Sequence, residues 1–209
     1  MNDASLKRLA RSPYLRFVTH LHLGGNTIGP TGLTALVQDC DLSSLLYLDL
    51  NFNTVGPRGA KAMVNTPHLG SLTHLHIGSN GLGNEGLESL SQAVSLGAVT
   101  HLTLWDNAIG DRGVRALTRS PILSGVTHLE LDWNTISDKG VKALATSPHV
   151  QTLTHLDLRH NALGREGVLA LAQSPYLRSL THLRLSVGRE YRPLLTTSPN
   201  LPNLVLLHT

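Results

Sequence analysis

The chain has 209 residues, of which 15% are charged and 4% are aromatic, a composition typical of an ordered chain with an aliphatic core. A formal charge of +3 with neutral histidines gives little bulk attraction to nucleic acid or to a membrane surface. Its single cysteine, Cys40, excludes an internal disulfide. No apolar run has the length of a membrane span, and residues 1–17 do not resemble a signal peptide, so we expect a cytoplasmic protein.

Residues 1–18 match only the helical half of a unit that then recurs, and we predict an N-terminal cap there. From residue 19 to residue 187 the sequence repeats every 27 residues without insertion or deletion. Leucine, asparagine and glycine each recur at fixed positions of the unit. The units begin at Thr19, Leu46, Thr73, Thr100, Thr127, Thr154 and Thr181.

The first part of each unit has the alternation of a half-buried strand. In the unit that begins at residue 127, Leu129 and Leu131 are predicted to point inward, and His128 and Glu130 outward. Asn134 follows where the chain turns, and a buried amide there can pair with backbone groups of adjacent turns.

The second part of each unit has helix signals. Ser137 and Asp138 are favourable residues at a helix start, and Val141 and Leu144 have amphipathic spacing. The Ser-Pro pair at 147–148 predicts the helix end, because the residue before proline avoids the helical region. Residues 188–209 lose the register, so we predict an irregular C-terminal cap. Within it, Leu201, Leu204 and Leu206 could form a last, shortened strand.

This pattern resembles the leucine-rich-repeat family, in the long, helix-containing, ribonuclease-inhibitor-like class that many bacterial repeat proteins share. The resemblance implies an α/β solenoid of about seven strand–helix units, with a curved parallel sheet on the concave side and helices on the convex side. Residues 1–209 are expected to form one domain, because a single unit buries too little apolar surface to fold alone.

Residues at the outward positions of the strands do not pack in the core, so their chemistry is the best functional clue in the sequence. Both tryptophans fall on adjacent repeats of this surface, among acidic residues, whereas the helical side is basic. An alternative is that each tryptophan folds over neighbouring strands and fills local surface. We favour a partner contact, because tryptophan and arginine contribute strongly to interfaces. The predicted contact residues are Trp105, Asp106, Glu130, Asp132, Trp133, Asp157, Arg159 and His160.

One outward column holds six histidines and one tyrosine: His20, Tyr47, His74, His101, His128, His155 and His182. We interpret it first as a repeat consensus multiplied by duplication. A pH sensor is an alternative, since neighbouring imidazolium charges would repel and depress the histidine pKa values. A metal site at His20, His22, Asp49, His74 and His76 is given less weight, because a flat sheet does not readily enclose a tetrahedral ion.

The sequence therefore predicts a non-catalytic scaffold whose concave face binds a protein with a basic or mixed-charge surface. We expect a monomer with no cofactor and no resident metal, and with neither nucleic acid nor membrane as its partner. Two alternatives remain open. One is a regulatory component of an enzyme system, either GTPase-activator-like or ubiquitination-recruiting, and the other is a purely structural array.

Overall fold

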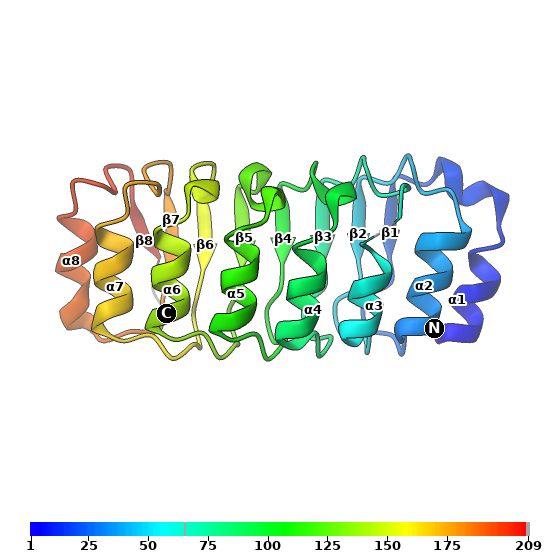
Figure 1. Cartoon of the computed structure of the whole chain (residues 1–209), viewed down its shortest axis with the longest axis horizontal. Coiled ribbons are helices and arrows are strands. Elements are labelled where there is room, and N and C mark those ends of the chain that lie inside the picture. The colour runs from blue at the N-terminus through cyan, green and yellow to red at the C-terminus, as the bar shows by residue number, and fades with distance from the viewer. Residues whose placement is uncertain (65, 208–209) are drawn as a thin grey trace.

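The computed structural model describes residues 1–64 and 66–207. Eight parallel strands form one continuous sheet in chain order, from β1 to β8. Eight α-helices, α1 to α8, lie in a second layer along one face of this sheet (Figure 1). Within the described ranges, no helix has the length and apolar character needed to cross a bilayer.

Each strand has three residues and pairs in parallel with the strand of the next unit. From β1 to β7 the register advances by one repeat, so that Leu102 lies beside Leu129 and Leu129 beside Leu156. The eighth strand forms the shortened last unit that the sequence allowed within residues 188–209. It includes Leu206 but neither Leu201 nor Leu204, and its Val205 pairs with His182. The strands are β1 (His20–His22), β2 (Tyr47–Asp49), β3 (His74–His76), β4 (His101–Thr103), β5 (His128–Glu130), β6 (His155–Asp157), β7 (His182–Arg184) and β8 (Val205–Leu207).

Helices need about 8–10 Å between their axes, whereas parallel strands need about 4.8 Å. This difference places the sheet on the concave side and the helices on the convex side. The helices are α1 (Asp3–Leu9), α2 (Pro30–Asp39), α3 (Gly56–Ala62), α4 (Gly83–Leu90), α5 (Asp111–Leu117), α6 (Asp138–Ala145), α7 (Arg165–Ala172) and α8 (Arg192–Thr196).

Short 3₁₀ helices connect several α-helices to the next strand. The Ser-Pro pair at 147–148 follows α6, as predicted, but it also starts a 3₁₀ helix, because the Ser147 hydroxyl accepts the His149 N–H at 3.2 Å. The same hydroxyl donates to the Thr118 carbonyl of the preceding unit at 2.7 Å. The 3₁₀ helices are η1 (Pro13–Phe17), η2 (Val94–Leu96), η3 (Pro121–Gly125), η4 (Pro148–Val150) and η5 (Arg189–Tyr191).

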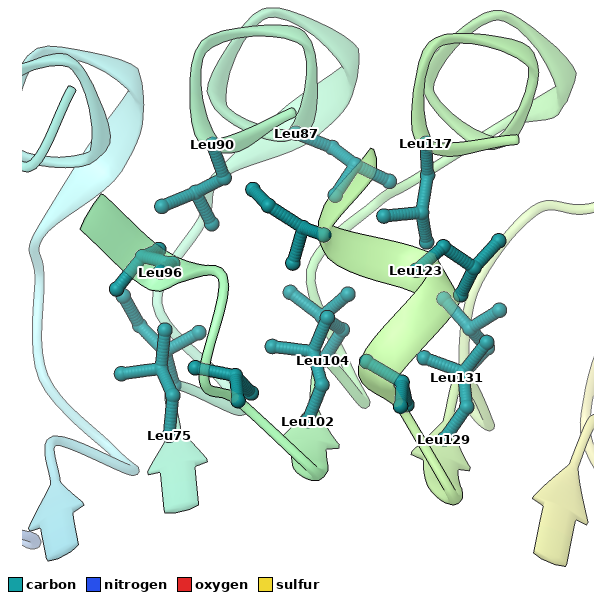
Figure 2. Close-up of a cluster of buried hydrophobic side chains, with 14 of the residues drawn as sticks. Leu75, Leu87, Leu90, Leu96, Leu102, Leu104, Leu117, Leu123, Leu129 and Leu131 are labelled. Carbon is teal, nitrogen blue, oxygen red and sulfur yellow. The ribbon is translucent and has the colours of Figure 1, made fainter. Parts of the chain in front are cut away.

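The core lies between the two layers and is almost entirely aliphatic. Leucines of the strands, such as Leu102 and Leu129, face helix leucines such as Leu90 and Leu117, and all of these are buried (Figure 2). Cys40, which follows α2, is buried in the same core.

A ladder of asparagines closes the turns after β1 to β6, as predicted, and the asparagines after β2 to β5 are buried. The Asn134 amide donates to the carbonyls of Leu131 in its own unit and Leu104 in the preceding unit, both at 3.0 Å. Its Oδ1 accepts the N–H groups of Asn107 at 3.1 Å and Ile109 at 2.9 Å. The amide therefore satisfies buried backbone groups of two adjacent units and fixes their register.

Candidate functional site on the concave face

The histidine column forms a continuous stack along the first residues of the strands from β3 to β7. Ring centroids of successive histidines from His74 to His182 lie 4.0–4.1 Å apart, with interplanar angles of 8–14°. Parallel pairing in register places the rings one above another, and neutral imidazoles pack well at this distance.

A threonine beside each histidine orients its ring. The Thr127 hydroxyl lies 2.9 Å from His128 Nδ1 and 3.2 Å from the Thr100 carbonyl. The hydroxyl has one proton, so it can donate to only one of these two atoms. Both contacts are hydrogen bonds when the hydroxyl donates to the Thr100 carbonyl and accepts the N–H of His128 Nδ1. In this tautomer Nε2 is the ring nitrogen left as an acceptor.

Burial and neighbouring imidazoles both disfavour charge on the stack. The pKa of His128 is lowered to about 4, first by burial and then by the charges that His101 and His155 would carry. The pKa values of His101 and His155 are lowered as well, with burial again as the largest cause. This agrees with the predicted direction of the histidine pKa values.

At the N-terminal end of the column, Tyr47 interrupts the stack. Its ring lies between two pairs of imidazoles, at 4.9 Å from His22 and 5.0 Å from His76. Asp49, the proposed carboxylate ligand, instead accepts the Asn51 N–H at 2.9 Å. Among the described residues, no three histidine, cysteine, aspartate or glutamate side chains are grouped closely enough to hold a metal ion.

A second column, at the turns after β1 to β6, has left-handed backbone conformation. Asp106, Trp133 and His160 belong to it, with φ of 50–55°. This conformation turns their side chains outward at one edge of the sheet. The Trp133 indole stacks on the His160 ring with centroids 3.9 Å apart, and Trp133 remains 58% exposed.

Trp105 lies in the neighbouring column and leans in the opposite direction along the array. Its indole covers Gly78, where a Cβ atom would come within 2.3 Å of the ring. Its edge meets the Phe52 ring, two units away, with centroids 4.8 Å apart. Trp105 is partly buried in this way, as the local-filling interpretation expected, whereas Trp133 is the exposed indole.

Asp157 was predicted to contact a partner at the surface, but its side chain is buried. Arg159 lies over it, with Nη2 at 2.6 Å and Nε at 2.9 Å from the carboxylate oxygens. Arg184 Nη1, from the next strand, lies 3.6 Å from the same carboxylate. Two guanidinium groups therefore neutralise Asp157, which acts as an anchor for Arg159.

Glu130 and Asp132 have a different environment on the adjacent unit. In residues 1–64 and 66–207, neither carboxylate has a cation within 4 Å, although Arg159 is close enough to influence Asp132. The pKa of Asp132 is raised to about 6, first by burial and next by the charge of Asp157. These two acids carry negative charge that the surrounding residues do not balance fully.

The repeats match the model of one known family, described as Leucine Rich repeat, over residues 14–37, 41–64, 68–91, 99–117, 126–145 and 149–172. These segments cover more than half of the chain. The chain belongs to the leucine-rich-repeat family. Its assignment to the ribonuclease-inhibitor-like class stays a prediction.

The fold of this leucine-rich-repeat protein is similar to a solved structure described as Leiomodin-1 Actin-Binding Site 2. The two are 22% identical, with a TM-score of 0.51, over 69% of this chain and 88% of that one. No curated protein matches the chain with significance.

Two residues of this leucine-rich-repeat surface were not among the predicted contacts, although the repeat columns contain both. Arg184 occupies the register position of Asp157 one strand later, and Phe52 that of Asp106 two units earlier. The column positions could have identified them. The structure gathers seven of the eight predicted residues into two groups. Trp105 lies with Phe52, and the second group consists of Glu130, Asp132, Trp133, Asp157, Arg159 and His160. The eighth residue, Asp106, is exposed and accepts a hydrogen bond from the Ser79 hydroxyl at 2.7 Å.

Proposed function

We propose that this protein is a non-catalytic scaffold that binds a partner protein on its concave face, through the surface around Trp133. The observation that carries this proposal is the exposed Trp133 indole, held against His160 beside the incompletely balanced acids Glu130 and Asp132. An exposed, oriented tryptophan with charged neighbours has the composition of an interface hot spot.

The rigidity of the surface supports the same proposal. Trp133 projects from a turn in which Asn134 donates to the Leu131 and Asp132 carbonyls and Asn161 accepts the Ile136 N–H, and its ring is already stacked. A preformed contact loses little conformational entropy on binding. The solved leiomodin structure is described as an actin-binding site, so the fold serves protein binding in that protein.

Affinity capture with matched variants tests the proposal. The full chain is used as bait in three forms: wild type, Trp133→Ala, and Tyr14→Ala, which removes an exposed aromatic ring from η1. We expect wild type and Tyr14→Ala to retain a common protein that Trp133→Ala loses. Direct binding of that protein should weaken at least about tenfold for Trp133→Ala. Equal retention by all three folded baits would refute the proposal.

A further inference from the structure

A pocket of about 340 Å³ opens on the concave face over strands β5 to β7. Its floor is formed by the backbones and side chains of three adjacent strands in register. Its polar lining combines imidazole, carboxylate and guanidinium groups. These are His128, Glu130, His155, Asp157, His182 and Arg184.

Arg184, which lines this pocket, and its neighbour Arg159 are both already engaged. Arg159 makes a bidentate contact with Asp157, and Arg184 lies 3.6 Å from the same buried carboxylate. A ligand carboxylate or phosphate would have to compete with Asp157 for both guanidinium groups. The pocket is therefore poorly suited to an anion.

The acids beside this pocket are not balanced in the same way. Glu130 and Asp132 lie two residues apart on one face of the chain, about 7 Å from each other along the strand direction. Within the described chain, no other residue donates a hydrogen bond to either carboxylate. Asp132 is partly buried, so its ionised form is held in an environment that disfavours it.

The imidazoles add acceptors to the same pocket. The Nδ1 atom of each imidazole is hydrogen-bonded to the hydroxyl of the preceding threonine at 2.8–2.9 Å. The pairs are Thr127–His128, Thr154–His155 and Thr181–His182. The tautomer that satisfies these threonines leaves Nε2 of each ring as an acceptor. Carboxylates and imidazole acceptors together require a ligand that carries positive charge and several N–H donors.

We propose that this pocket receives one arginine side chain of the partner protein, with Glu130 and Asp132 as its counter-ions. A guanidinium group supplies five N–H donors in a plane, which suits two separated carboxylates and an imidazole edge. Trp133 follows Asp132 directly in the chain, and its exposed indole is stacked on His160. This inference rests on the proposed concave-face function and names the chemistry of its central contact.

A titration with a small probe tests the pocket without the partner. N-acetyl-arginine amide is added to the purified full chain while the ring resonances of His128, His155 and His182 are followed by NMR. The neutral isostere N-acetyl-citrulline amide serves as the control for charge, and acetate as the probe for an anion. We expect saturable shifts with the arginine probe in the millimolar range, and none with citrulline or acetate.

Two variants and one matched control assign the contact. Glu130→Gln and Asp132→Asn should each weaken the arginine probe at least about threefold, whereas Glu166→Gln, an exposed acid on α7, should not. Circular dichroism confirms that each variant is folded. No shift with arginine, equal binding by the variants, or stronger shifts with acetate would overturn the proposal. If the probe fails while a partner is still captured through Trp133, the arginine pocket is wrong and the concave-face function stands.

Discussion

Asp138, the first residue of α6, accepts a hydrogen bond at 2.9 Å from the backbone N–H of Gly167 in the next helix, α7. The same carboxylate oxygen accepts the Gly164 N–H at 2.7 Å. Each of these N–H groups lacks a partner within α7, because the first turn of a helix has no preceding carbonyls. One unit therefore caps the helix of the next, and the cap is also a contact that stacks the two units.

Replacement of this cap should destabilise the array. Asp138→Ala leaves two partly buried N–H groups without an acceptor, and we expect the free energy of unfolding to fall by about 1–3 kcal/mol. Urea denaturation followed by circular dichroism measures the change.

The chain itself supplies the control for this prediction. Asn84 occupies the same register position two units earlier, and its Oδ1 accepts the N–H groups of Gly110 at 2.9 Å and Gly113 at 2.8 Å. Asp138→Asn should therefore retain most of the stability that Asp138→Ala loses. Equal losses in the two variants would show that the hydrogen bonds are not the cause.

The glycine that recurs in helices α2 to α7 should be intolerant of a side chain, because the preceding unit packs closely against it. In Gly140→Ala, the added Cβ would lie 2.6 Å from Asp111 Oδ1 and 2.7 Å from Ile136 Cγ2. We expect a loss of about 1–3 kcal/mol in the free energy of unfolding. Gly70→Ala is the control, because nothing lies within 4 Å of its Cβ, and it should be neutral or slightly stabilising. A tolerated Gly140→Ala would contradict the close packing of α5 and α6.

The histidine stack should make folding weaken on acidification. The pKa of His128 is about 4 in the folded protein and near 6.5 in the unfolded chain, with His101 on β4 and His155 on β6 facing it. Between these values the unfolded chain binds more protons, so the stability present above pH 6.5 is lost as the pH falls towards 4. Adjacent imidazolium pairs cost about 1 kcal/mol each even in water.

Chemical denaturation at a series of pH values measures this slope. His128→Gln removes the central ring of the stack and should reduce the pH dependence between about 6.5 and 4. If His128→Gln leaves the pH dependence of the free energy of unfolding between about pH 6.5 and 5 unchanged, the repulsion makes no significant contribution.

Asp132 should have the opposite effect on stability. Burial and the charge of Asp157 raise the folded pKa of Asp132 to about 6, above the unfolded value of 3.8. The stability that the protonated carboxyl contributes is therefore fully present below pH 3.8 and is lost as the pH rises through 6. We expect Asp132→Asn to stabilise the protein by about 1 kcal/mol at pH 7.5, after a reduction for solvent screening. The gain should disappear below about pH 4, where both states of the wild type carry a protonated carboxyl.

If Asp132→Asn is more stable than wild type and also binds the arginine probe less well, the wild-type carboxylate lowers the stability of the fold but contributes to binding. Unfolding curves for wild type and variant at pH 7.5 and at low pH provide the comparison. A variant less stable than wild type at pH 7.5 would contradict an unfavourable environment for the carboxylate.

The sequence by itself determined the strands, the core and the columns of the concave face. A repeat of constant length places Leu129 beside Leu156 and His128 beside His155, because side-chain direction alternates along a strand and each unit pairs with the next in register. The same periodicity predicts the buried Asn134, whose amide donates to equivalent carbonyls, as those of Asn53, Asn80, Asn107 and Asn161 do.

The tertiary structure alone decided what each non-repeating side chain does within its column. Asp157 became buried because Arg159 and Arg184 converge on it from two strands, and Trp105 covers Gly78 because that residue leaves room for a ring. The register fixes the position and face of a residue. Long side chains reach into the neighbouring units, so their direction depends on residues that do not repeat.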